Sequence, residues 1–130
     1  MKRVLIPILM SVAILLATSS CATLKKGELR LNSMDIPENG NLKANIQFWV
    51  RIYFEADGNP EISRACFFWS GDGPYCFNVK DIKYGSFAYF EVPLLARLGP
   101  DTLQCYVEYV RDGKTQRSNA IASFITGVMR

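Results

Sequence analysis

The chain of 130 residues contains no histidine. Histidine is the side chain most often used as a general base and a frequent zinc ligand, so its absence removes the commonest centre for both kinds of chemistry. No two cysteines have the C-x₂₋₄-C spacing that holds zinc. The carboxylates are scattered, and pairs such as Glu55 and Asp57 flank a turn. We therefore expect a protein that is not an enzyme and that has no cofactor and no metal site.

The chain also lacks a large excess of one charge, with 15 basic and 12 acidic residues. If residues 1–20 are removed, Lys2 and Arg3 are lost and 13 basic residues remain against the 12 acidic ones. Binding to nucleic acid needs a concentrated basic face, so we expect no nucleic-acid partner. Lys25 and Lys26 are placed to contact anionic head groups, although two charges in a linker are more often simply solvated.

No apolar run is long enough to cross a bilayer as a helix. The longest, residues 4–17, has 14 residues interrupted by Pro7 and Ser11, whereas a membrane-spanning helix needs about 20. Positive residues precede this run, and the small residues Thr18, Ser19 and Ser20 follow it. A positive start, a short apolar middle and a small-residue end are typical of an export signal. We predict that residues 1–20 are a signal peptide and that the protein leaves the cytoplasm.

The stretch LLATSSC, which ends at Cys21, resembles a bacterial lipoprotein signal. Ser19 and Ser20 fit the small positions before the cysteine, and Thr18 stands where leucine is usual. The resemblance implies that the Cys21 thiol is joined to diacylglycerol, that the bond before it is cut, and that the new amino group is acylated, for example with palmitate. In the alternative, an ordinary signal peptidase cuts after Ala22 and Cys21 is discarded.

Lipidation at Cys21 would make residues 21–27 a tether and residues 28–130 the anchored domain. One acyl chain gives marginal membrane binding, so the three chains that the resemblance implies form a durable anchor. Ala22 follows the cysteine in place of the aspartate that marks inner-membrane retention in Gram-negative lipoproteins. By this resemblance we expect a protein of the cell envelope, anchored to the outer membrane and facing the periplasm.

An oxidising compartment favours disulfide bonds, and three cysteines remain if Cys21 is acylated. Cys66 and Cys76 flank a turn-forming segment around Gly71. A hairpin about this turn places the two cysteines opposite each other, within reach of a disulfide. Cys105 is the alternative partner for either of them, and spacing alone does not decide. If Cys66 pairs with Cys76, we expect Cys105 to be a small buried apolar group.

Residues 42–54 alternate strictly between apolar and other side chains. A period of two cannot form one apolar stripe on a helix, so this segment is predicted to be a long half-buried strand with Ile46 among its inward side chains. The only helix candidate is a single turn at residues 94–98. Six further strands are predicted at residues 28–35, 62–69, 75–82, 86–92, 101–111 and 115–126. Seven strands separated by turn residues indicate an all-β sandwich or barrel.

The second half of the chain resembles the fibronectin type III and immunoglobulin-like group of β-sandwiches. The resemblance rests on residues 98–102 followed by residues 106–125, in which Ser118 and Asn119 match the opening of the last strand. Gln104 stands where the group usually has tyrosine. The resemblance implies a single immunoglobulin-like sandwich of about seven strands, and it implies no function by itself.

Trp49, Arg51 and Tyr53 are predicted to project from one face of the long strand, opposite its apolar stripe. In one interpretation, loops or neighbouring side chains cover Trp49 and Tyr53. In the other, the three residues form a binding strip, because aromatic residues and arginine are enriched at binding hot spots. We therefore expect a lipid-anchored envelope protein with a non-catalytic domain that binds an envelope protein or has a structural role. The alternative is a carbohydrate-binding module that uses exposed aromatic side chains.

Overall fold

The computed structural model describes residues 23–43, 46–70, 72–96, 100–125 and 127–129. The predicted signal peptide and the predicted lipidation site Cys21 lie outside these residues. Strands dominate the described part, and its one helix is the short 3₁₀ turn η1 (Pro37–Gly40). Within the described part, no helix has the length and apolar character needed to span a membrane.

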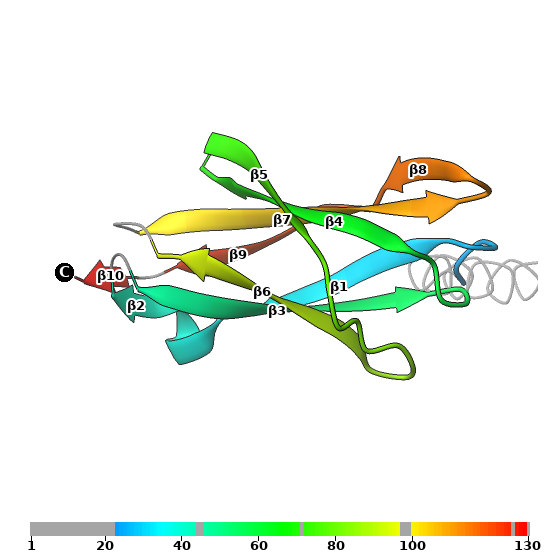
Figure 1. Ribbon diagram of the computed structural model, residues 1–130. Helices are drawn as coiled ribbons and strands as arrows, with labels where there is room; N and C mark the ends of the chain where they lie inside the picture. The colour runs from blue at the N-terminus through cyan, green and yellow to red at the C-terminus, as the bar shows by residue number, and fades with distance from the viewer. Residues whose placement is uncertain (1–22, 44–45, 71, 97–99, 126, 130) are drawn as a thin grey trace, which may run out of the picture.

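Two antiparallel sheets lie face to face, so the predicted β-sandwich is confirmed (Figure 1). The first sheet has the order β1 (Leu29–Asp35), β3 (Gln47–Ala56), β6 (Ala88–Leu95). The second has the order β5 (Asp72–Asn78), β4 (Ile62–Trp69), β7 (Asp101–Arg111), β8 (Lys114–Arg117), and β9 (Ile121–Ile125) also pairs with β7. A small parallel pair joins β2 (Asn41–Lys43) to β10 (Gly127–Met129).

One apolar core fills the space between the two sheets. Alternate residues of β3 and β6 point into it because successive side chains of a strand face opposite ways, whereas β8 is exposed along its length. Val50 and Ile52 on β3 and Phe90 on β6 are fully buried from the first sheet, and Phe67 on β4 and Leu103 on β7 from the second. The core thus joins strands from the whole length of the described chain.

The predicted strand at residues 42–54 is two separate elements. Its first part, β2, pairs with β10, whereas β3 pairs with β1 and β6. Ile46 lies just before β3 and is 52% exposed, so its predicted inward position is wrong. The two parts thus belong to different sheets, β2 to the small parallel pair with β10 and β3 to the first sheet.

Three other boundaries differ from the prediction. Residues 115–126 hold two strands, β8 and β9, which pair with successive halves of β7. β5 begins at Asp72 and ends at Asn78, before the predicted end at residue 82. The predicted helical turn at residues 94–98 is wrong at its start, because Leu94 and Leu95 pair with Phe48 and Gln47 and complete β6. Backbone pairing to β3 overrides the local preference there.

Candidate functional site

Trp49, Arg51 and Tyr53 lie on the outer face of the first sheet, while Val50 and Ile52 between them are buried. The neighbouring strand β6 contributes side chains to the same face. Trp49 is opposite Pro93, Arg51 is opposite Glu91, and Tyr53 is opposite Tyr89. The period-two alternation therefore placed these three side chains together correctly, and β6 supplies the partners that the sequence did not reveal.

Arg51 and Tyr53 are engaged by their neighbours. The Arg51 guanidinium lies 4.3 Å from the centre of the Tyr89 ring, and its Nη2 is 3.5 Å from Glu91 Oε1. Its Nη1 donates a hydrogen bond of 3.4 Å to the Tyr53 hydroxyl. This bond, with the nearby Glu91 carboxylate, raises the pKa of Arg51. The Tyr53 and Tyr89 rings are in contact, with centroids 6.0 Å apart.

Trp49 is different, because 53% of its surface is exposed. The interpretation that neighbours cover the strip therefore holds in part for Tyr53, which is half-buried, and is wrong for Trp49. The strip is thus the exposed Trp49 indole next to a cluster of contacting side chains, Arg51, Tyr53, Tyr89 and Glu91.

An apolar groove lies near Trp49, at the β6 edge of the first sheet. Pro93, opposite Trp49, is part of its lining, and so is Leu95, which is 62% exposed. The groove has a volume of about 430 Å³. Its lining contains no charged side chain: Gln47, Phe67, Trp69, Tyr75, Phe77, Pro93, Leu94, Leu95 and Ala96.

The groove exists because β5 extends past the edge of the first sheet, so the first sheet does not cover its inward side chains. β5 is the edge strand of the second sheet, and β6 is the edge strand of the first. Tyr75 and Phe77 pair with Phe67 and Ala65 and face the same way as these two core residues. They nevertheless remain 41% and 36% exposed, since no strand of the first sheet lies over them among the described residues. In Figure 1, β5 bends away from the strands beneath it.

The edge of β6 next to the groove is open over its last residues. Tyr89 exchanges two backbone hydrogen bonds of 2.9 Å with Lys83, which close the start of this edge. Beyond Tyr89, the outward backbone groups of Glu91 and Leu95 find no backbone partner within the described residues. Pro93 lies between them. Proline has no N–H, and within sheets it is found mainly on edge strands such as β6. The groove is therefore bordered by an open strand edge.

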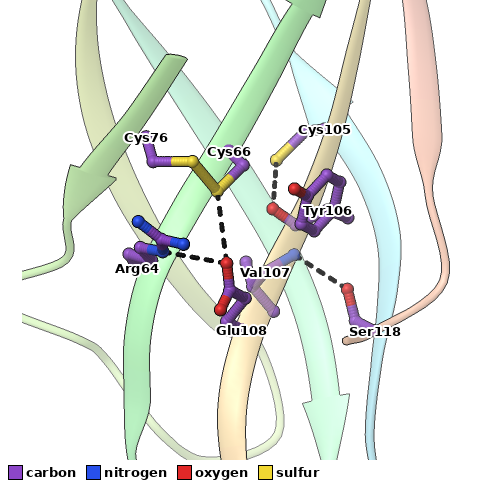
Figure 2. Close-up of a disulfide and its surroundings, with 8 residues drawn as sticks. All are labelled: Arg64, Cys66, Cys76, Cys105, Tyr106, Val107, Glu108 and Ser118. Atoms are coloured by element: carbon purple, nitrogen blue, oxygen red, sulfur yellow. Dashed lines mark hydrogen bonds and ion pairs between the residues drawn. A yellow bond between two sulfur atoms is a disulfide. The ribbon is translucent and has the colours of Figure 1, made fainter. Parts of the chain in front are cut away.

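A disulfide joins Cys66 to Cys76 on the outer face of the second sheet (Figure 2). The two residues are directly opposite in the β4–β5 hairpin, with Cα atoms 4.1 Å apart, as the hairpin argument predicted. Glu108 Oε1 lies 3.8 Å from Cys66 Sγ and accepts a hydrogen bond of 2.8 Å from Arg64 Nε. Both sulfurs are used in the disulfide, so they are not available to a metal as thiolates.

Cys105 is a free thiol, and the alternative pairing through it is not formed. Its side chain is fully buried in the core, and burial raises its pKa to about 12. A thiol with such a raised pKa carries almost no thiolate at neutral pH and is a poor nucleophile. Cys105 therefore has the apolar packing role that the sequence suggested.

Sequence reasoning found Trp49 but missed the groove. Tyr75 and Phe77 are alternating aromatic residues of the chain, but alternation alone does not predict that the other sheet leaves them uncovered. Leu95 was assigned to a helical turn, and it is instead an exposed residue of the open edge. The chain matches no protein-family profile, no curated protein and no solved structure.

Proposed function

We propose that this chain is a lipid-anchored protein of the cell envelope whose non-catalytic β-sandwich binds an extended apolar segment of another protein. The binding site is the groove between β5 and β6. The observation that carries this proposal is the gathering of exposed apolar side chains, including Trp49, Tyr75, Phe77 and Leu95, at one end of a small domain. Contiguous exposed apolar surface of this kind marks interaction sites in soluble domains.

Two features favour an extended segment as the ligand. The open edge of β6 offers backbone donors and acceptors, and strand addition to such an edge is a recurring mode of peptide recognition. The groove beside it accepts side chains and has no charged lining residue, so alternate apolar residues of the segment would fill it. Hydrogen bonds along the edge would supply affinity, and the groove would supply the preference for apolar residues.

The anchor is proposed from the sequence alone. Residues 1–20 have the layout of an export signal, and LLATSSC provides Cys21 for acylation, with the outer membrane as the expected site. The intact mass of protein extracted from membranes tests this point, because acylation adds the mass of the lipid to a chain that begins at Cys21. A chain that begins at Thr23 without lipid would overturn the anchor and leave the groove proposal standing.

A photo-crosslinking amino acid at Tyr75 tests the groove in intact cells. We expect a discrete crosslinked product that contains a second protein, and we expect Leu95→Glu to abolish it, because the new charge would be buried by the ligand. Leu95 is exposed in the free domain, so this substitution leaves folding intact. The matched control is Phe87→Glu, since Phe87 is exposed and does not line the groove. Equal crosslinking in wild type and Leu95→Glu would contradict the proposal.

The exposed indole of Trp49 supports a second candidate, a carbohydrate-binding surface. Trp49 lies outside the groove lining, so the two functions separate by mutation. Retention on a glycan array that is lost in Trp49→Ala and kept in Leu95→Glu would favour carbohydrate binding. No glycan retention at all would argue against carbohydrate binding, and retention that is lost only in Leu95→Glu would place a sugar in the groove and contradict the proposed protein ligand.

A further inference from the structure

The chain that precedes β1 is fixed to one end of the domain. The Gly27 N–H donates a hydrogen bond of 2.9 Å to Asp57 Oδ2, and Arg111 Nε donates one of 2.8 Å to the Lys26 carbonyl. The Lys25 and Glu28 residues close a turn with two further bonds of 3.0 Å. The backbone is therefore held against the domain from Lys25 onwards.

This fixed end lies opposite the groove. β3 begins at Gln47, which lines the groove, and ends at Ala56, next to the Asp57 that holds Gly27. Ten strand residues span about 30 Å. β7 runs a similar length in the same direction, from Leu103 beside Trp69 to Arg111 beside Lys26. In Figure 1, β1 starts at the right, whereas β2, the end of β6 and the start of β7 lie at the left.

Only a short tether separates the predicted anchor from the fixed end. Cys21 and Lys25 are four residues apart, so their Cα atoms can be at most about 14 Å from each other. This reach is about half the length of β3. An anchor at Cys21 therefore keeps the Lys25 end of the domain close to the lipid head groups. The tether is too short for the groove end to face the membrane with the Lys25 end pointing away from it.

We infer that the domain stands on the membrane with its Lys25 end against the lipid head groups and its groove directed into the aqueous space. The surface in contact with the head groups is formed by Lys25, Lys26, the turn at residues 57–60 and the turn at residues 112–113. The segment that enters the groove then belongs to a protein that approaches from the aqueous side. This inference rests on the proposed lipid anchor.

Fluorescence quenching on vesicles tests the orientation with the full lipidated chain. A fluorophore is attached to Asn59→Cys at the tether end or to Gln47→Cys at the groove end, and the protein is inserted into phosphatidylcholine vesicles that contain a head-group quencher lipid. Cys105 is buried and remains unlabelled, and the wild-type chain measures background. We expect strong quenching at residue 59 and little at residue 47. Equal quenching at both, or stronger quenching at residue 47, would overturn the inference.

A lengthened tether is the matched control. A flexible Gly–Ser segment inserted between Leu24 and Lys25 is expected to reduce quenching at residue 59, because the domain can then leave the surface. Unchanged quenching would show that the tether does not set the orientation, which contradicts the argument. Failure of the wild-type chain to float with vesicles would overturn the anchor itself, so the two proposals fail in distinguishable ways.

Discussion

The side-chain amide of Asn119 pairs with both backbone polar groups of Leu31. Asn119 Oδ1 accepts a hydrogen bond of 2.8 Å from the Leu31 N–H, and Nδ2 donates one of 2.9 Å to the Leu31 carbonyl. The preceding residue, Ser118, bonds to both backbone groups of Val107 on the second sheet. The Ser118–Asn119 pair thus joins the two sheets along the side where β1 lies beside β9, opposite the open side with the groove.

Asn119→Ala is expected to lower the free energy of unfolding by about 1–3 kcal/mol, because it leaves the Leu31 N–H and carbonyl without their partners. Urea denaturation measures the change. Gln116→Ala is the control, since Gln116 is exposed on β8 and its loss is expected to change stability by no more than about 0.5 kcal/mol. Equal stability of the two variants would show that the amide pairing contributes nothing.

Removal of the disulfide by the double substitution Cys66→Ala and Cys76→Ala is expected to cost about 2–4 kcal/mol, because the unfolded chain gains freedom when the closed loop is opened. The midpoint and slope of urea unfolding report this loss. Alkylation of the unfolded, unreduced protein is expected to modify Cys105 alone among these three cysteines. Modification of Cys66 or Cys76 under those conditions would contradict the observed pairing.

Cys105 is expected to resist thiol reagents at pH 8 in the folded protein and to react rapidly in urea. Burial raises its pKa from 9.0 to about 12, so the folded state contains little thiolate at this pH. The measurement is the rate of reaction with a chromogenic disulfide reagent. Comparable rates in the folded and unfolded protein would show that the thiol is accessible.

The same thiol predicts a loss of stability in alkali. The folded pKa lies above the unfolded value, so the unfolded state loses its proton first and stability falls as pH rises from about 9 to about 12. Between pH 8 and pH 10, wild type is expected to lose about 1 kcal/mol more than Cys105→Ala. Urea unfolding of both proteins at both pH values checks this difference, and parallel losses in the two proteins would contradict it.

Phe48 and Trp49 are neighbours with opposite roles. Phe48 is 5% exposed and packs edge-on against Trp69 in the core, so Phe48→Ala is expected to cost about 3–5 kcal/mol. Trp49→Ala removes an exposed indole and is expected to cost less than about 1 kcal/mol. Thermal unfolding of the two variants distinguishes them, and a large loss in Trp49→Ala would make the indole a structural residue.

Local patterns predicted the parts of this fold that local chemistry decides. The alternation around Val50 separated the core face of β3 from the face with Trp49, and the turn residues near Gly71 set the register that pairs Cys66 with Cys76. Long-range pairing decided the rest. Residues 42–54 are divided because β2 pairs with β10 while β3 pairs with β1 and β6, and the groove follows from how far β5 extends past β6. Neither the pairing of β2 nor the extent of β5 can be predicted from the residues of those strands alone.

Pro93 gives the open side of the sandwich a further property. An unpaired strand edge can recruit identical chains into fibrils. A missing donor in the middle of this edge interrupts any regular ladder between copies. Many copies of the protein on one membrane can therefore expose the open β6 edge without forming fibrils through it. A ligand can pair with this edge only if it does not need a hydrogen bond from residue 93.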